Sequence, residues 1–200
     1  MSAFARAPAS RYGVAAPAAA GRARIVTVPL SDQPVVPVTR ARVRRLRMHL
    51  VETLRALRTL PDAERAATPA RPEPDGLGGA VARTACGLCR GVCCKGGGDH
   101  AYLDEGTLAR VRRARPELEA GAVIALYVGQ VAGSVHRDSC VFHGANGCTL
   151  DRALRSDVCN SYFCPPLGQF VDHPRAPDGV VVIAREGHVQ RRAPVLRQQP

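Results

Sequence analysis

The stretch Cys86-Gly-Leu-Cys89-Arg-Gly-Val-Cys93-Cys94-Lys-Gly-Gly-Gly98 holds four of the eight cysteines of this 200-residue chain. It begins as a CxxC knuckle, in which two thiolates can bind one metal ion because Gly87 leaves room for the turn. Cys89 and Cys93 lie four residues apart and share a face if the segment is helical. Cys93 and Cys94 are adjacent and must point in different directions, so one of them serves a second site or is a buried spectator. The glycine run at 96–98 is equally consistent with a segment that wraps closely around a cluster and with a plain loop.

A second group of four cysteines follows about fifty residues later. Asn146-Gly147 is a tight-turn signal between the first two members of this group. The last member is followed by Pro165-Pro166, and a proline after a cluster cysteine is common in iron–sulfur proteins. We therefore predict that all eight cysteines are metal ligands: Cys86, Cys89, Cys93, Cys94, Cys140, Cys148, Cys159 and Cys164. Zinc and iron–sulfur clusters, most often [4Fe–4S], both take four thiolates. One site with spare cysteines and two sites both remain open.

The cysteines favour metal over disulfides because the expected compartment is reducing. No run approaches 18 apolar residues, so no transmembrane helix is predicted. The apolar stretch at 13–21 is short and interrupted by Pro17, which does not fit a secretion signal. We expect the cytoplasm of a bacterium. Residues 1–31 hold four Arg and no acid, as a mitochondrial presequence does, so the mitochondrial matrix is the alternative in a eukaryote.

The net charge of +11 is concentrated at the two ends of the chain. Residues 1–80 contain 13 Arg and six acids, whereas residues 81–190 contain 12 basic and 11 acidic residues. Two sites of four thiolates, each with Zn²⁺ or [4Fe–4S]²⁺, would turn this nearly neutral region negative. A nucleic-acid-binding core is instead basic on one face, so nucleic acid is an unlikely partner of the core. The basic ends could still contact nucleic acid or anionic lipid.

Five segments organise the chain. Residues 1–40 are predicted to be a disordered tail, with a short strand from Ile25 to Val28 as its one ordered candidate. Residues 61–80 are a linker rich in Pro and Gly, 81–190 form the cysteine-cluster domain, and 191–200 are a basic tail. Residues 41–60 form a basic amphipathic helix whose apolar positions recur at three- and four-residue steps: Val43, Leu46, Leu50, Leu54, Leu57 and Leu60. This helix either packs on the core or recruits a protein partner.

Within the cysteine domain, residues 103–127 are predicted to be helical, with Asp104 as a cap and a break near Pro116. Residues 180–184 predict one strand after the Asp178-Gly179 turn. The chain has no Trp, four Tyr and four Phe, and much of its apolar content is Ala, so we expect a thin core that needs a staple. The predicted fold class is a small, α-rich, irregular domain with little β structure, organised around cysteine-ligated metal.

Histidine ligation, radical-SAM chemistry and a nucleophilic cysteine are alternatives to ligation by eight thiolates. His100 and His143 lie close to the cysteine groups, and either could replace one thiolate. Eight thiolates already fill two four-ligand sites, so a surface or supporting role is favoured for both. The order C-x2-C-x3-C is the reverse of the radical-SAM motif, which that enzyme class requires. No single cysteine stands out as a nucleophile.

At residues 84–166 the chain resembles the cysteine-cluster proteins named for a CxxCxxCC motif, described as zinc- or iron-chelating domains. It is similar over the same region to the flagellin lysine N-methylases. The first motif is carried with three residues, rather than two, before Cys93-Cys94, and Tyr102-Leu103-Asp104-Glu105 resembles the stretch that follows it. The later pattern is matched by Cys140, Cys148, Leu150, Arg155, Cys159 and Cys164, and departs at Asp151, Ser156 and Asn160.

The resemblance implies metal binding and an iron–sulfur centre. It does not extend the methylase activity to this chain, because no residue suggests a flagellin site. Our leading hypothesis is a metal-binding protein with a redox or accessory role. The alternatives are a cluster-dependent protein-modifying enzyme of the methylase kind, and a zinc-stapled binding module whose basic ends contact nucleic acid.

Overall fold

The structure, a computed structural model, describes residues 23–61, 74–145, 147–172, 178–194 and 196–197. Its helices are α1 (Arg40–Thr59), α2 (Gly76–Cys89), α3 (Glu105–Ala114), α4 (Ala120–Gly129), α5 (Asp157–Ser161) and α6 (Pro165–Val171), with short 3-10 helices η1 (Cys93–Gly97) and η2 (Arg152–Leu154). Its strands are β1 (Ala23–Pro29), β2 (Val35–Pro37), β3 (Ser134–His136), β4 (His143–Gly144), β5 (Gly147–Cys148), β6 (Gly179–Glu186) and β7 (Val189–Arg192). Residues 1–22 of the presequence-like segment lie outside these residues, as do parts of the expected tails and linker.

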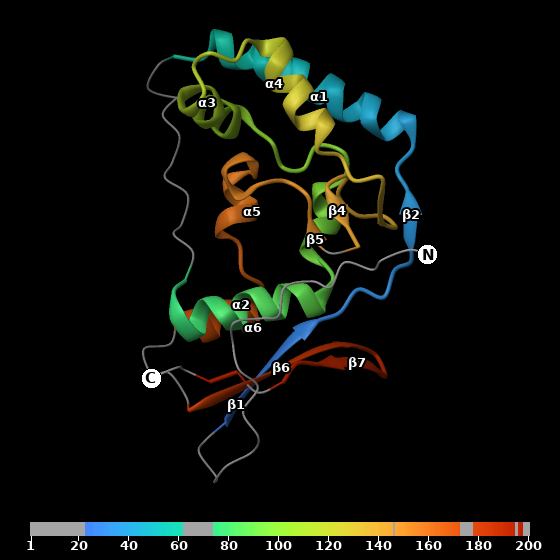
Figure 1. The fold of residues 1–200 in the computed structure, drawn as a ribbon, viewed down its shortest axis with the longest axis vertical. Helices are drawn as coiled ribbons and strands as arrows, with labels where there is room; N and C mark the ends of the chain where they lie inside the picture. The colour runs from blue at the N-terminus through green and yellow to red at the C-terminus, as the bar shows by residue number, and fades with distance from the viewer. Residues whose placement is uncertain (1–22, 62–73, 146, 173–177, 195, 198–200) are drawn as a thin grey trace, which may run out of the picture.

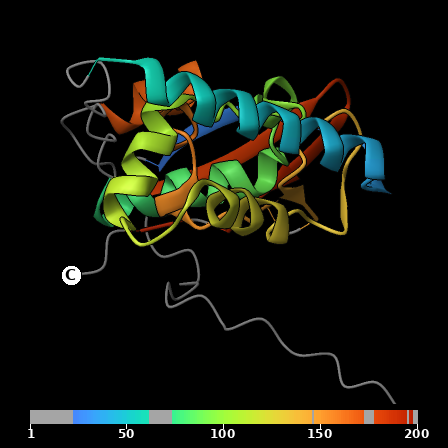
Figure 2. The same cartoon turned by 90° about the horizontal axis from the view of Figure 1, so that it is seen from above.

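The elements stack in three tiers (Figure 1). The upper tier consists of α1, α3 and α4, and α1 spans the width of the fold when seen from above (Figure 2). The lower tier is a sheet of order β1-β6-β7, with α2 and α6 packed on it. Between them lie η1, the β4–β5 hairpin and α5, which together carry Cys93, Cys94, Cys148 and Cys159. The middle tier is therefore held from both sides by regular structure.

The upper tier packs around the leucine stripe of α1. Thr39 caps this helix by accepting a hydrogen bond from the Arg42 N–H, and Leu46 and Leu50 are fully buried. Asp104 caps α3 as predicted, and the helical region breaks around Pro116 before α4 begins. We call this cluster the upper core; its buried members include Leu46, Leu50, Leu54, Leu57, Leu103, Leu108, Tyr127, Cys140 and Phe142.

The lower tier depends on a contact between segments more than 150 residues apart. Strand β1 pairs in parallel with β6, with Val26 opposite Val182 and Val28 opposite Ala184. Strand β6 reads as a continuous apolar run because it is buried on both faces. We call this cluster the lower core; its buried members include Val26, Val28, Leu77, Val81, Ala85, Cys89, Leu167, Phe170, Val180 and Val182.

Helix α2 begins inside the segment that the sequence marks as a linker. Gly79 faces the backbone carbonyl of Pro74 so closely that a Cβ would collide with it. The glycine therefore permits a close approach, and Leu77 and Val81 gain burial against the sheet. That burial offsets the roughly 1 kcal/mol that each helical glycine costs relative to alanine.

The expected fold class is wrong. Helical residues make up 47% and strand residues 19% of the described chain, and the strands form three small sheets, so the fold is mixed. Two apolar cores organise it, rather than a metal centre. The expectation failed because valines far apart in sequence pair across a sheet, which composition does not reveal. Within the expected N-terminal tail, the strand expected at Ile25–Val28 forms as part of β1, and the second strand β2 was not expected.

No helix among the described residues is long and apolar enough to cross a membrane.

Candidate functional site

The eight predicted ligands lie in or beside the middle tier, at six places along the chain. Cys86 and Cys89 lie on the last turn of α2, and Cys93 and Cys94 begin η1. The remaining four lie before β4, at the end of β5, in α5 and at the cap of α6: Cys140, Cys148, Cys159 and Cys164. All eight are free thiols. The two sequence groups are thus brought together by the fold.

The first neighbourhood, which we call the lower thiol set, comprises Cys86, Cys89, Cys93 and Cys164. Partial desolvation, together with the charges of Cys93, Cys89 and Cys164, raises the pKa of Cys86 to about 12. Desolvation also raises the pKa of Cys89, and the charges of Cys93 and Cys164 add to this effect. These mutual effects mark the four thiols as electrostatic neighbours. Cys89 belongs to the lower core and Cys164 packs against it.

The second neighbourhood, the upper thiol set, comprises Cys94, Cys140, Cys148 and Cys159. Burial raises the pKa of Cys140 to about 12, and the charges of Cys148 and Cys159 contribute. Desolvation raises the pKa of Cys159, with contributions from Cys148 and from Cys93 of the lower set. Cys140 belongs to the upper core and Cys94 packs against it. Cys93 therefore stands at the junction of the two sets.

Cys93 and Cys94 interact directly. A hydrogen bond from the Cys94 thiol lowers the pKa of Cys93 to about 7, although burial opposes the change. The same bond raises the pKa of Cys94, because that thiol is held as the donor. Cys93 is accordingly the thiol of this pair that ionises near neutral pH. A thiolate is the form that binds metal.

The turn between Cys89 and Cys93, both members of the lower set, is shaped by glycine. Gly91 has φ +68°, and a Cβ placed there would lie 2.6 Å from Nε2 of His143. The imidazole therefore rests on the Gly91 backbone, which joins the first cysteine segment to the second. Val92 N–H donates a 3.4 Å hydrogen bond to the Cys89 sulfur. Such N–H groups stabilise a thiolate charge.

Tyr102 is a site residue that spacing alone did not identify. Its hydroxyl donates to the Cys93 carbonyl at 3.4 Å, and its ring lies across Gly96 and Gly97. Desolvation raises the pKa of Tyr102, and four thiols add to the effect, led by that of Cys159. Tyr102 has φ +56°, a region that costs a non-glycine residue on the order of 1 kcal/mol or more. This strained backbone directs the ring onto the Gly96-Gly97 stretch that follows Cys94.

Arg42 links the two cysteine segments from α1. Its guanidinium donates to Asp99, to the Ser139 carbonyl and to the Gly98 carbonyl at 3.4 Å. Asp99 also pairs with Arg45. Partial burial acts to raise the pKa of Asp99, but the two guanidinium groups hold it below its usual range. One arginine thus ties the glycine run after Cys94 to the residue before Cys140.

Replacement of Arg42 by Gln is expected to cost about 2 kcal/mol of unfolding free energy. This cost lies between the values typical of exposed ion pairs and of buried ones, because the two side chains are 17% and 18% exposed. Arg44→Gln, on the exposed side of the same helix, is the control and should change stability by less than about 0.5 kcal/mol. Urea denaturation measures both. Equal effects would contradict the linking role of Arg42.

The two candidate histidine ligands have other contacts. His100 is exposed, lies 5.6 Å from the rings of both His49 and Tyr102, and accepts a hydrogen bond from Tyr102 N–H. His143 is buried, and its Nδ1 lies 2.8 Å from the Ser139 hydroxyl. Its ring is 4.7 Å from that of His136. The structure therefore gives both rings supporting contacts.

The chemistry and the number of the thiols suit two four-thiolate centres. The side chains of the two sets, however, are spread apart in the structure. Within the described part of the chain, no three His, Cys, Asp or Glu side chains are grouped closely enough to hold a metal ion. Arg155 lies near both sets and lowers the pKa values of Cys86 and Cys159, opposing the effects of burial and the other thiols. Its positive charge would partly balance a dianionic centre. Arg155 matches the family's later pattern but was not a predicted site residue, and no motif marked Arg42.

Comparisons of the chain with protein-family models, curated proteins and solved structures found no match. The evidence for function therefore lies in the residues and their arrangement.

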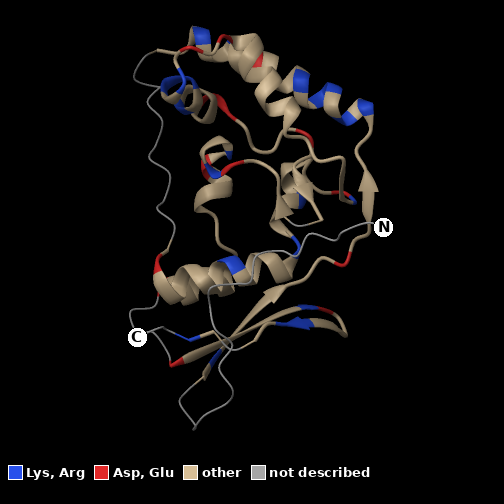
Figure 3. Ribbon diagram, in the orientation of Figure 1, with Lys and Arg blue, Asp and Glu red and all other residues tan. Residues whose placement is uncertain are grey.

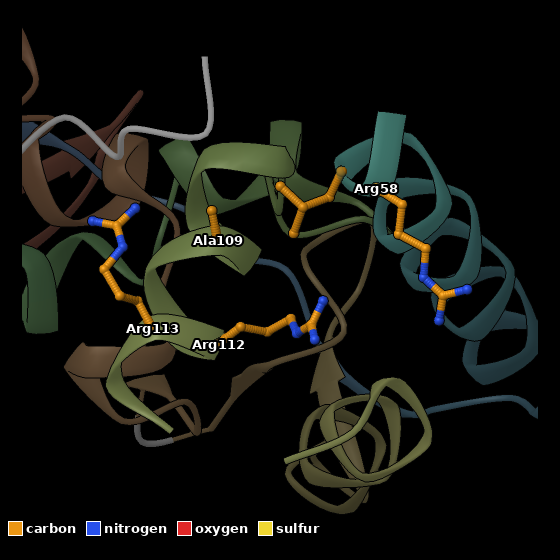
Figure 4. A pocket seen from close by; sticks show the side chains of 5 residues that line it. Arg58, Ala109, Arg112 and Arg113 are labelled. Carbon is orange, nitrogen blue, oxygen red and sulfur yellow. The ribbon is translucent and has the colours of Figure 1, made fainter. Parts of the chain in front are cut away.

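Two surface hollows lie away from the thiols. One, of about 300 Å³, lies between α1 and α3 and is lined by Leu57, Arg58, Ala109, Arg112 and Arg113. In it Arg58 and Arg112 lie on either side of the gap, while Arg113 extends from the other side of α3 (Figure 4). The second, of about 400 Å³, lies beside the Arg42–Asp99 pair. Neither is lined by a cysteine.

Proposed function

We propose that this protein binds metal through its eight cysteines, as iron–sulfur centres of the [4Fe–4S] type, and serves a redox or accessory role. The observation that carries the proposal is the gathering of eight free thiols, from distant parts of the chain, between two apolar cores. Neighbouring thiols repel one another once ionised, and a bound cation removes that repulsion. The resemblance to cysteine-cluster proteins supports the same reading.

The chain would contribute ligands, charge balance and shielding. Four thiolates per centre come from the two sets, and the Val92 N–H already faces a ligand sulfur. The Tyr102 hydroxyl donates to the Cys93 carbonyl, and hydrogen bonding and burial near the ligands tune the potential of a cluster. A bound cluster would supply one-electron redox chemistry. Zinc would supply a structural link instead.

Metal analysis of anaerobically purified protein tests the proposal. We expect a brown protein with iron and acid-labile sulfide and broad visible absorbance. A colourless protein with stoichiometric zinc would show that the bound metal is zinc and not iron. A chain purified from metal-replete cells without either metal would refute metal binding. Because both cores consist mainly of apolar side chains that pack on one another, chelation should leave most of the helical circular dichroism in place.

The alternatives make different predictions. A cluster-dependent methylase would bind a methyl donor, which calorimetry with S-adenosylmethionine detects. A zinc-stapled nucleic-acid module would bind DNA with strong salt dependence and lose that binding when residues 1–60 are deleted. The proposed compartment is the cytoplasm, where the thiols stay reduced, with the mitochondrial matrix as the alternative. Localisation of a tagged full-length chain separates the two.

For the partner, we propose an acidic protein that docks on α1. Five exposed arginines repeat at helical steps along one side of this helix: Arg40, Arg44, Arg47, Arg55 and Arg58. Figure 3 shows basic positions along α1, where acidic ones are few. The helix carries no aromatic residue of the Phe, Tyr or Trp kind to stack on bases, which favours a protein over single-stranded nucleic acid.

A direct test uses polyglutamate as the acidic probe. The variant R44Q/R47Q/R55Q is expected to bind it at least several-fold more weakly, with binding that falls as salt rises. Tighter binding of duplex DNA than of polyglutamate by the unmodified chain would favour nucleic acid instead.

A further inference from the structure

The hollow between α1 and α3 is the more basic of the two surface hollows. Its volume of about 300 Å³ lies at the small end of the range of roughly 300–1,000 Å³ that is typical of ligand pockets. Three of its five lining residues are arginines, and none is acidic. The second hollow is lined by two aspartates as well, and its Arg42 and Arg45 already pair with Asp99. The charges therefore favour an anion at the first hollow.

The floor of this hollow is apolar. Leu57 of α1 and Ala109 of α3 are 5% and 8% exposed, and both belong to the upper core. Helices α1 and α3 pack against each other, and the short side chain of Ala109 leaves space that a longer one would fill. A small ligand thus finds apolar surface beneath it and guanidinium groups beside it.

The arginines reach the hollow from different helices. Arg58 lies in the last turn of α1 and Arg112 in the last turn of α3, on either side of the gap (Figure 4). Within the described part of the chain, no hydrogen bond or ion pair holds the half-buried Arg112. Each arginine also opposes the negative end of its own helix. That role needs a positive charge at each helix end, but it does not need two arginines beside one hollow.

Guanidinium groups bind phosphate and carboxylate oxygens through paired N–H donors. A phosphomonoester carries a charge of about −1.5 to −2 at pH 7, so it matches two arginines, whereas a single carboxylate matches one. We propose that the hollow binds the phosphomonoester of a small molecule, with its phosphate between Arg58 and Arg112 and its ester group on Leu57 and Ala109. The hollow lies away from the thiols, so this site goes beyond the proposed metal binding and does not depend on it.

Calorimetric titration of the full chain with glycerol 3-phosphate at low salt tests the proposal. We expect Arg112→Gln to weaken binding by about tenfold, because charge-assisted hydrogen bonds are lost. Ala109→Met keeps every charge and places a flexible apolar side chain in the hollow, so it should weaken binding as well. Circular dichroism checks that both variants fold.

The R44Q/R47Q/R55Q variant is the matched control, since these arginines lie on α1 outside the hollow. It should bind glycerol 3-phosphate within about twofold of the wild type. A loss as large as that of R112Q would overturn the proposal, because a diffuse basic surface would then account for binding. Equal affinity for glycerol and glycerol 3-phosphate would overturn it too. Binding of a phosphoserine peptide but not of glycerol 3-phosphate would overturn the small-molecule source and keep the phosphate site.

Discussion

Replacement of Gly91 by Ala is expected to destabilise the protein by about 2–5 kcal/mol. A left-handed backbone costs a residue with a Cβ about 1–2 kcal/mol, and Gly91 has φ +68°. The new methyl would also lie 2.6 Å from Nε2 and 2.9 Å from Nδ1 of His143. That ring is only 4% exposed and cannot move aside freely, so overpacking adds about 1–3 kcal/mol. Urea denaturation at neutral pH measures the change.

The matched control for Gly91 is Gly87, which lies in the same cysteine segment. Gly87 is exposed inside α2, and a Cβ there would meet nothing within 4 Å. Gly87→Ala should therefore stabilise the helix by about 0.5–1 kcal/mol. Opposite signs for the two substitutions are the expected result. A Gly91→Ala variant as stable as the wild type would show that His143 does not rest on this backbone.

The stability of the protein is expected to fall by about 2 kcal/mol between about pH 7 and about pH 5. Burial, together with the charge of nearby His136, lowers the pKa of His143 from 6.5 to about 4. Between these values the unfolded chain binds a proton that the folded chain does not. Stability from this group is therefore complete above about pH 6.5 and is lost as the pH falls toward 4.

His143→Gln is the variant that isolates this effect. Glutamine does not titrate, so the difference in unfolding free energy between the two pH values should shrink by most of 2 kcal/mol. Staying above about pH 5 keeps most carboxylates ionised in both states. The measurement is urea denaturation at each pH. A variant with the same pH dependence as the wild type would assign the loss to other groups.

Several local features could be predicted from the sequence. The leucine stripe indicates α1, Asp104 indicates the start of α3, and Pro116 the break before α4. The valine run indicates β6. Each of these depends on residues within one or two turns of chain, where periodicity and capping act. The candidate ligands were likewise named from residue type and spacing, while their role as ligands stays a prediction.

Other features depend on contacts between distant segments. Residue type could not reveal that β1 pairs with β6, because strand propensity does not name a partner. Helix α2 forms in a glycine-rich stretch, since burial of Leu77 and Val81 outweighs local preference. These two errors led to the expectation of an irregular domain that needs metal to hold it together.

The segment 86–98 illustrates the limit of prediction from sequence. Its spacing indicates thiolate chemistry, and the adjacency of Cys93 and Cys94 indicates that they diverge. Which cysteines share a neighbourhood follows from the two cores, because each buries one thiol and packs a second from a remote segment. Arg42 then links the segments through carbonyls that any sequence would provide. Backbone partners of this kind leave no mark in the sequence, so packing alone assigns them.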